Sequence, residues 1–338
     1  DIYVLVRAAD EKHGLERLRS ELRTIAPDRP VRKDWLDRIH PVCGDLTQTN
    51  LGLSTTRWNT LAEQVDSIYH NGAWVNYLYD YGTLRAANVG GTNEIIRLAM
   101  SHRPKVLNHI STTFVFGWSA KEVLYEKDNN QDLDLLDFGY SQSKWVSEQV
   151  VRDAMRQGLR ARIFRPALIT PSIDGRGGSF DIAVRLLTFM VQHGIGTTAA
   201  NQVSFSPADQ TADNIVSVAL QPASLDKTFH VTRDDYASMQ DVTSILADLS
   251  GKSFTHYPIT AFIPQVTSRC QQGDILFPLL DFFLRSTDNI AAMEFKRYDN
   301  ANYQRYRDLA PLSKADPPLE DVVLGIWRFM LHHQLVNR

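Results

Sequence analysis

Apolar and polar positions follow two alternating patterns over the first 170 residues of the chain. Amphipathic helices are indicated where apolar residues recur at spacings of three and four, at residues 13–26, 55–65, 77–101 and 140–158. Short apolar, β-branched runs between them predict strands at 2–8, 39–46, 67–73, 106–112 and 160–166. Because parallel strands need a crossover connection, this alternation predicts an α/β fold with a doubly wound parallel sheet.

The pattern changes after about residue 172. The loop "TPSIDGRGGS" (170–179) is followed by an apolar helical segment at 181–194 and by further helical patterns at 278–286 and 319–336. We therefore predict a sheet domain over residues 1–172 and a smaller, mainly helical substrate-binding domain over residues 173–338. "TFHVTRD" (228–234) is strand-like, so we expect 222–245 to rejoin the first sheet.

Composition narrows the classes of partner. A net charge of -3, without a long basic run, argues against nucleic acid and anionic membranes. Cys43 and Cys270 lie too far apart to predict a disulfide framework or a metal site, and they fit a cytoplasmic protein. No run of about 18 apolar residues could span a bilayer. The chain enters a strand almost directly after Asp1, so we expect a piece of a longer polypeptide.

The segment "GYSQSKW" (139–145) carries candidate chemistry where a predicted helix begins. Tyr140 and Lys144 are four residues apart, so a helix places them on the same face. An ammonium beside a phenol favours the phenolate and lowers the phenol's pKa from about 10 toward a value useful for acid catalysis. The alternative interpretation is a solvated pair on an amphipathic helix.

Two neighbouring segments favour the catalytic interpretation. "NHISTTFVFG" ends a predicted strand with the hydroxyl residues Ser111, Thr112 and Thr113, at the edge where such sheets bind ligands. "IFRPALITP" (163–171) runs from a further strand into a loop that could border the same site. A hydroxyl, a phenol and a lysine at one sheet edge can polarise and protonate a carbonyl while hydride arrives.

These motifs, together with "CGDLTQTNLGLS" (43–54), resemble in order and spacing the thioester reductase domains that end nonribosomal peptide synthetases, polyketide hybrids and carboxylic acid reductases. Those domains belong to the extended branch of the short-chain dehydrogenase/reductase superfamily, and the likeness covers roughly residues 2–220. The resemblance implies a Rossmann-like first domain and NADPH-dependent release of an acyl or peptidyl thioester, carried on the phosphopantetheine of a carrier protein, as an aldehyde or alcohol.

The resemblance also implies a catalytic triad of Thr112, Tyr140 and Lys144. Thr112 and Tyr140 would hydrogen-bond the substrate carbonyl oxygen, Tyr140 would donate its proton, and Lys144 would hold the nicotinamide ribose. Ser111 and Thr113 are the nearest rivals for the hydroxyl role.

By resemblance, the strand at 2–8 corresponds to the second strand of a dinucleotide fold. An arginine after that strand accommodates the 2′-phosphate of NADP, so Arg7, with Arg17 as a second cation, favours NADPH. By resemblance, the remaining cofactor-binding residues are Asp45, Leu46, Asn71, Gly72, Ala73 and Pro166, in addition to Lys144. We expect Asn88 to brace the strand that leads to Thr112.

One part of the family pattern lies outside this sequence. The resemblance implies a first strand and a glycine-rich phosphate loop some twenty residues before the strand at 2–8. The nearest match within the chain, "GIGTTA" (194–199), follows an apolar helix and opens none, so we interpret it as unrelated to phosphate binding.

Two other functions are consistent with the same residues. A nucleotide-sugar epimerase or dehydratase of the extended type shares the threonine, tyrosine and lysine set. A redox-silent relative could bind the cofactor as a sensor or release product by condensation.

Overall fold

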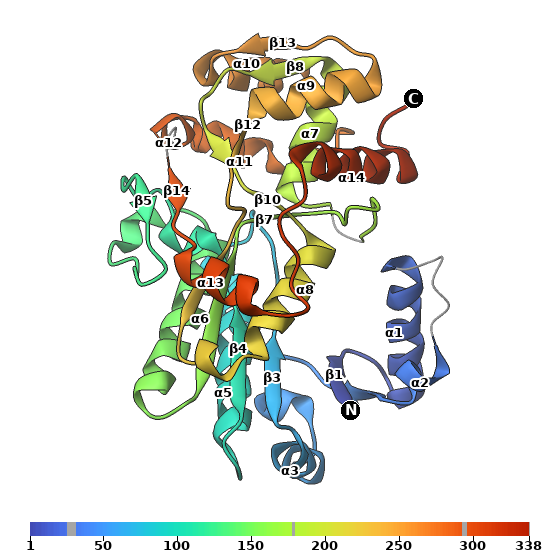
Figure 1. Ribbon diagram of the computed structural model, residues 1–338, viewed down its shortest axis with the longest axis vertical. Coiled ribbons are helices and arrows are strands. Elements are labelled where there is room, and N and C mark those ends of the chain that lie inside the picture. The colour runs from blue at the N-terminus through green and yellow to red at the C-terminus, as the bar shows by residue number, and fades with distance from the viewer. Residues whose placement is uncertain (26–31, 178–179, 293–295, 338) are drawn as a thin grey trace. The chain divides into compact units, whose positions relative to one another are not determined.

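The computed structural model describes residues 1–25, 32–177, 180–292 and 296–337 (Figure 1). The chain divides into two compact units. The first comprises Asp1–Ser111, Phe138–Ile163 and Leu225–Lys227, and the second comprises Thr112–Asp137, Phe164–Ser224 and Thr228–Arg338.

Parallel strands organise the first unit. Its strands are β1 (Ile2–Val6), β2 (Ile39–Cys43), β3 (Ser67–His70), β4 (Val106–Ile110) and the beginning of β6 (Ala161–Pro166). β1 pairs with β2 in parallel, and β3 pairs with β4 in parallel with His70 opposite His109. β1 and β2 form a two-stranded sheet, whereas β3 and β4 belong to a four-stranded sheet of order β11-β6-β4-β3. The predicted parallel α/β architecture is confirmed.

Each of these strands begins within a residue of its predicted start, but most end earlier than the apolar pattern suggested. β4 ends at Ile110 and not at residue 112, and β1 ends at Val6 and not at residue 8. The residues that follow leave the hydrogen-bonding ladder and form loops at the carboxyl ends of the strands. The candidate residues Arg7, Asp45 and Thr112 all lie in such segments.

Helices connect the strands of the first unit. They are α1 (Glu11–Ile25), α2 (Lys33–Leu36), η1 (Thr49–Gly52), α3 (Thr55–Gln64), α4 (Tyr81–Arg85), η2 (Ala86–Gly90), α5 (Gly91–Met100) and α6 (Gly139–Arg156). In Figure 1, α5 runs along β3 and β4, which it contacts.

The helix predicted over residues 77–101 differs in two respects. It begins only at Tyr81, because the Asp80 side chain accepts the backbone N–H of Thr83 and caps the helix there. Its middle turn, Ala86–Gly90, is a π-helix. Such turns are frequent at functional sites, and this one contains Asn88.

Apolar side chains from the helices and strands of the first unit form one core. Its buried members include Val42 of β2, Trp58 of α3, Ile68 of β3, Leu107 of β4 and Val151 of α6. Because β1 and β2 pack through the same core as β3 and β4, their loops come together at one edge.

The second unit is mainly helical. Its helices are η3 (Thr113–Phe116), η4 (Leu133–Leu135), α7 (Ile182–His193), α8 (Ala208–Ala219), η5 (Pro222–Ser224), α9 (Met239–Ser250), α10 (Ile259–Arg269), η6 (Phe277–Leu279), α11 (Leu280–Arg285), α12 (Thr287–Ala292), α13 (Ala301–Leu309) and α14 (Leu319–His332). Its strands, besides the end of β6, are β5 (Val123–Leu124), β7 (Leu168–Thr170), β8 (Ile195–Thr197), β9 (Gln202–Val203), β10 (Phe205–Pro207), β11 (Thr228–Val231), β12 (Ala237–Ser238), β13 (Thr255–Tyr257) and β14 (Arg297–Tyr298).

Two sequence expectations fall in this unit. The strand-like segment at 228–234 forms β11 and lies beside β6 in the four-stranded sheet. "GIGTTA" contains the end of α7, where Gly194 adopts a left-handed conformation, and then strand β8. It opens no helix, as expected.

Gly139 determines how closely α6 approaches α4. A Cβ at Gly139 would overlap the backbone of Tyr79 and Asp80, whereas a Cβ at the exposed Gly82 of α4 would meet only Asp80 Oδ1, at 3.6 Å. We expect Gly139→Ala to lower the free energy of unfolding by about 1–3 kcal/mol through overpacking. Gly82→Ala should raise it by up to about 1 kcal/mol, because alanine favours a helix over glycine.

Chemical denaturation of the two variants measures both effects. Equal stability changes of the same sign would contradict this account of the contact between α4 and α6.

Candidate active site

Helix α6 carries Tyr140 and Lys144 one turn apart on a buried face. Only 8% of Tyr140 and 4% of Lys144 is exposed to solvent, so the alternative of a solvated surface pair is wrong. The Tyr140 ring packs edge-on against Tyr77, with ring centroids 5.6 Å apart. The phenol is therefore held in place by packing as well as by the helix.

Lys144 is anchored to the end of β4. Its Nζ donates a hydrogen bond to the Ile110 carbonyl oxygen at 2.7 Å. Burial lowers the pKa of Lys144 from 10.5 to about 8, and the nearby Glu148 carboxylate partly opposes this shift. The ammonium therefore titrates close to neutral pH, directly behind the strand end that leads to Thr112.

Glu148 supports this arrangement, and it was absent from the sequence-derived residues. It is fully buried, and one carboxylate oxygen accepts a hydrogen bond from Ser111 Oγ at 2.7 Å. The other oxygen accepts two hydrogen bonds from the Arg152 guanidinium, at 2.8 and 3.0 Å. Continuing the four-residue spacing from Tyr140 through Lys144 would have reached Glu148, so the sequence did contain a signal for it.

The three hydroxyl residues after β4 have different partners. The Ser111 hydroxyl donates to Glu148, and the Thr113 side chain forms a hydrogen bond with Tyr298. Thr112 Oγ1 accepts the backbone N–H of Phe114 at 3.2 Å and caps η3. That bond does not use the hydroxyl proton of Thr112, which can still be donated to a substrate oxygen. Thr112 is thus better suited to this role than its two rivals.

Asn88 does not brace β4, and that expectation is corrected. Its side-chain amide forms two hydrogen bonds with the backbone of Trp74, one in each direction, and donates a third to Ser143 Oγ at 2.9 Å. The Asn88 carbonyl accepts hydroxyl bonds from Thr92 and Ser147. Asn88, which lies in the π-turn, therefore joins the loop after β3 to α6.

Two histidines lie buried behind Lys144. His70 and His109 pack with ring centroids 5.5 Å apart, and burial lowers the pKa of both, that of His70 to about 3. His70 Nε2 lies 2.9 Å from Thr92 Oγ1, whose proton is donated to the Asn88 carbonyl. Nε2 must therefore carry the imidazole proton of a neutral His70. With both rings neutral, the two histidines add no positive charge beside Lys144.

The candidate cofactor residues of the first unit gather where its strands end. Leu46 follows β2 and packs directly on Gly72, where a Cβ would come within 2.7 Å of Leu46 Cδ1. Asp45 accepts the backbone N–H and hydroxyl of Thr47, which lower its pKa, and Arg7 lowers it further by its charge. The Arg17 guanidinium donates to the Arg7 carbonyl, and both arginines are exposed.

The other residues of this set are placed as follows. Asn71 and Gly72 are exposed and Ala73 is half-buried in the loop after β3. Pro166 ends β6 and is buried, and it belongs with Thr112 to the second unit. The structure thus brings together Arg7, Asp45, Leu46 and Gly72 by contacts or charge.

Comparison with known proteins identifies the family. Residues 1–215 match the family model NAD_binding_4, described as male sterility protein. The chain belongs to this family. Its parallel α/β fold is of the extended short-chain dehydrogenase/reductase type, and its family is one of nicotinamide-cofactor domains.

Three known proteins show what this NAD_binding_4 chain resembles. It is 35% identical over 258 residues to a linear gramicidin synthase of Brevibacillus parabrevis, covering 75% of this chain and 5% of that protein. It is 36% identical over 235 residues to the large subunit of the L-2-aminoadipate reductase of Candida glabrata, covering 65% of this chain and 17% of that protein. The terminal R domain from the myxalamid PKS-NRPS biosynthetic pathway superposes with a TM-score of 0.90 at 29% identity, over 99% of this chain and 85% of that one.

The chain therefore spans only a small part of the two curated relatives. None of the helices in the ranges described above is long and apolar enough to cross a membrane.

The buried ammonium of Lys144 predicts a stability change that depends on pH. The shift from 10.5 to about 8 means that, below pH 8, the charged lysine destabilises the fold by about 3 kcal/mol. Lys144→Met should remove that penalty but leave the Ile110 carbonyl without its partner, for a net gain of about 2 kcal/mol at pH 7. Between pH 8 and 10.5 the unfolded wild type binds more protons than the folded one, so wild-type stability rises and the gain shrinks.

Denaturant unfolding at pH 7 and pH 10 measures this gain. Lys12→Met, at an exposed position of α1, is the control and should show no such change. A gain that grows with pH would contradict the assignment of a desolvated ammonium to Lys144.

Proposed function

We propose that this chain reduces an acyl or peptidyl thioester with NADPH and releases it as an aldehyde. The observation that carries the proposal is the hydrogen bond from Lys144 to Ile110, which ties the helix bearing Tyr140 to the strand that leads to Thr112. A phenol, a hydroxyl and a buried ammonium are groups that suit the protonation of a carbonyl oxygen during hydride transfer.

The residues of the first unit fit a nicotinamide dinucleotide. Gly72 has no side chain, so Leu46 packs directly on it and brings together the loops after β2 and β3, at the strand ends where such sheets bind ligands. Arg7 and Arg17 offer exposed guanidinium groups after β1, and arginine binds phosphate in a bidentate manner. This supports NADPH as the cofactor, with Asp45, Asn71, Ala73 and Pro166 as further contacts and Lys144 at the ribose.

The proposed proton chemistry uses groups of this chain. When bound, the cofactor supplies the hydride. Thr112 and Tyr140 donate hydrogen bonds to the thioester carbonyl oxygen, and Tyr140 gives up its proton as negative charge develops there. Lys144, cationic below about pH 8, stabilises the resulting phenolate. Collapse of the tetrahedral hemithioacetal then breaks the carbon–sulfur bond and releases the thiol and the aldehyde.

The likeness to parts of multidomain synthetases supports a carrier-bound substrate. The linear gramicidin synthase and the R domain of the myxalamid pathway are such relatives. We infer that the thioester is presented on the phosphopantetheine arm of an acyl or peptidyl carrier protein. A second reduction by the same residues would convert the aldehyde to an alcohol.

Thioester-dependent oxidation of NADPH tests the reaction. With an acyl-pantetheine thioester, Tyr140→Phe should lower kcat by about 10²–10⁴-fold, which is the usual contribution of a general acid. The control is Tyr69→Phe, at an exposed tyrosine of β3, which should leave kcat unchanged.

The products distinguish the other functions. Formation of aldehyde with stoichiometric thiol supports the proposal. Binding of NADPH without consumption across several thioesters would refute it and favour a redox-silent role, whereas turnover of a nucleotide sugar would favour an epimerase.

Cofactor choice depends on Arg7 under this proposal. Losing a charge-assisted hydrogen bond to the 2′-phosphate should lower kcat/KM for NADPH by about 10–100-fold in Arg7→Ala, while kcat/KM for NADH stays nearly constant. The matched control is Arg38→Ala, which removes an exposed arginine just before β2, at the other end of the same two-stranded sheet. Equal losses for both cofactors would remove Arg7 from the phosphate site.

A further inference from the structure

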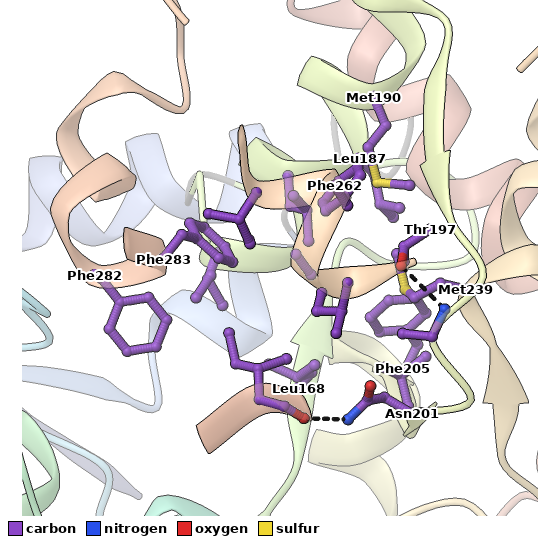
Figure 2. A pocket seen from close by; sticks show the side chains of 18 of the residues that line it. Leu168, Leu187, Met190, Thr197, Asn201, Phe205, Met239, Phe262, Phe282 and Phe283 are labelled. Carbon is purple, nitrogen blue, oxygen red and sulfur yellow. Dashed lines mark hydrogen bonds between the residues drawn. The ribbon is translucent and has the colours of Figure 1, made fainter. Parts of the chain in front are cut away.

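The second unit contains an apolar cavity that the proposed chemistry does not use. Its volume is about 220 Å³. Side chains from α7, α10 and α11 and from strands β7 and β10 surround it (Figure 2). Among them are Leu168, Leu187, Phe205, Phe262 and Phe283.

Polar side chains in the wall are directed to the protein itself. Thr197 Oγ1 accepts the backbone N–H of Ala199 at 3.0 Å, and Asn201 Nδ2 donates to the Ile290 carbonyl at 2.8 Å, as Figure 2 shows. Asn201 Oδ1 and Trp118 Nε1 have no hydrogen-bond partner among the residues that the structure describes, but both atoms are buried. The cavity therefore presents hydrocarbon to a ligand.

The cavity is connected to the proposed catalytic hydroxyl through one short turn. Phe114 lines the cavity, and its backbone N–H donates to Thr112 Oγ1 at 3.2 Å. Two residues of chain span at most about 7 Å, so the cavity wall and the hydroxyl are close neighbours within the second unit. Leu168 lines the cavity two residues after β6 ends, and the carboxyl end of a parallel strand is where such sheets bind ligands.

We propose that this cavity holds the hydrocarbon part of the acyl group whose thioester is reduced, and that it selects an apolar alkyl or aromatic chain without hydrogen-bonding groups. This inference rests on the proposed function for the identity of the thioester. A methylene group is about the size of a water molecule, which occupies about 30 Å³ in the liquid. The cavity therefore accommodates about seven carbon atoms of the chain. A polar group in that chain would lose its water without gaining a partner.

The test uses a series of acyl-pantetheine analogues in which nitrogen replaces the thioester sulfur, so that no reduction is needed. Calorimetry should show affinity rising about threefold to fourfold per methylene and reaching a plateau after about seven methylenes. A hydroxyl at the chain end should weaken binding tenfold or more relative to a methyl.

Two variants of α7 shift the plateau in opposite directions. Ala183 and Leu186 both line the cavity. Ala183→Leu fills it with about three carbon atoms and should bring the plateau about three methylenes earlier, whereas Leu186→Ala should move it about as far the other way. Thermal unfolding and the Kd for NADPH, which should match wild type, show that each variant is folded.

The outcomes separate this inference from the proposed function. If the analogues bind with the expected plateau shifts but no thioester is reduced, the cavity assignment stands and the reductase proposal fails. If thioesters are reduced but affinity is independent of chain length, or neither variant moves the plateau, the cavity assignment is overturned. Undiminished binding of the hydroxyl-ended chain would also overturn it, since the buried Asn201 and Trp118 atoms would then be pairing with ligand.

Discussion

The hydrogen bond between Lys144 and the Ile110 carbonyl is the interaction on which the candidate active site depends. A buried ammonium is unfavourable, and its pKa near 8 reflects that desolvation. The Ile110 carbonyl and the Glu148 carboxylate offset part of it, which ties α6 to the end of β4. The protein thereby retains a buried cation one helical turn from Tyr140, at the expense of stability, as is common at functional sites, and we propose that it stabilises a phenolate there.

Polar groups behind the site are held by one another. Ser111 and Arg152 hydrogen-bond Glu148, and Asn88 joins the loop after β3 to α6 through Trp74 and Ser143. Such buried polar groups are stable only when their hydrogen bonds are satisfied, so each restricts the position of the next. The apolar cavity of the second unit differs, because the described side chains of its wall present hydrocarbon. The selection that we propose there therefore depends on the size and polarity of the acyl chain.

Much of the fold could be predicted because strand and helix periods are local properties. β1, β2, β3 and β4 lie where the apolar runs placed them. Their ends could not be predicted, since residues 111–112 have the same β-branched and hydroxyl character as a strand but leave the ladder to cap η3 and to bond Glu148. The π-turn at Ala86–Gly90 was likewise hidden, because its apolar spacing is close to that of an α-helix.

By itself, the sequence determined the order of elements, the helical face shared by Tyr140 and Lys144, and the group of hydroxyl residues after β4, since each depends on neighbouring residues along the chain. Tertiary structure alone decided which of those hydroxyls is engaged elsewhere, that Glu148 rather than a residue of the motif supports Lys144, and that Asn88 turns to Trp74. It also determined that an apolar cavity forms, because the walls of that cavity come from segments far apart in the chain. Those features depend on desolvation and on contacts between distant segments, which spacing along a sequence does not encode.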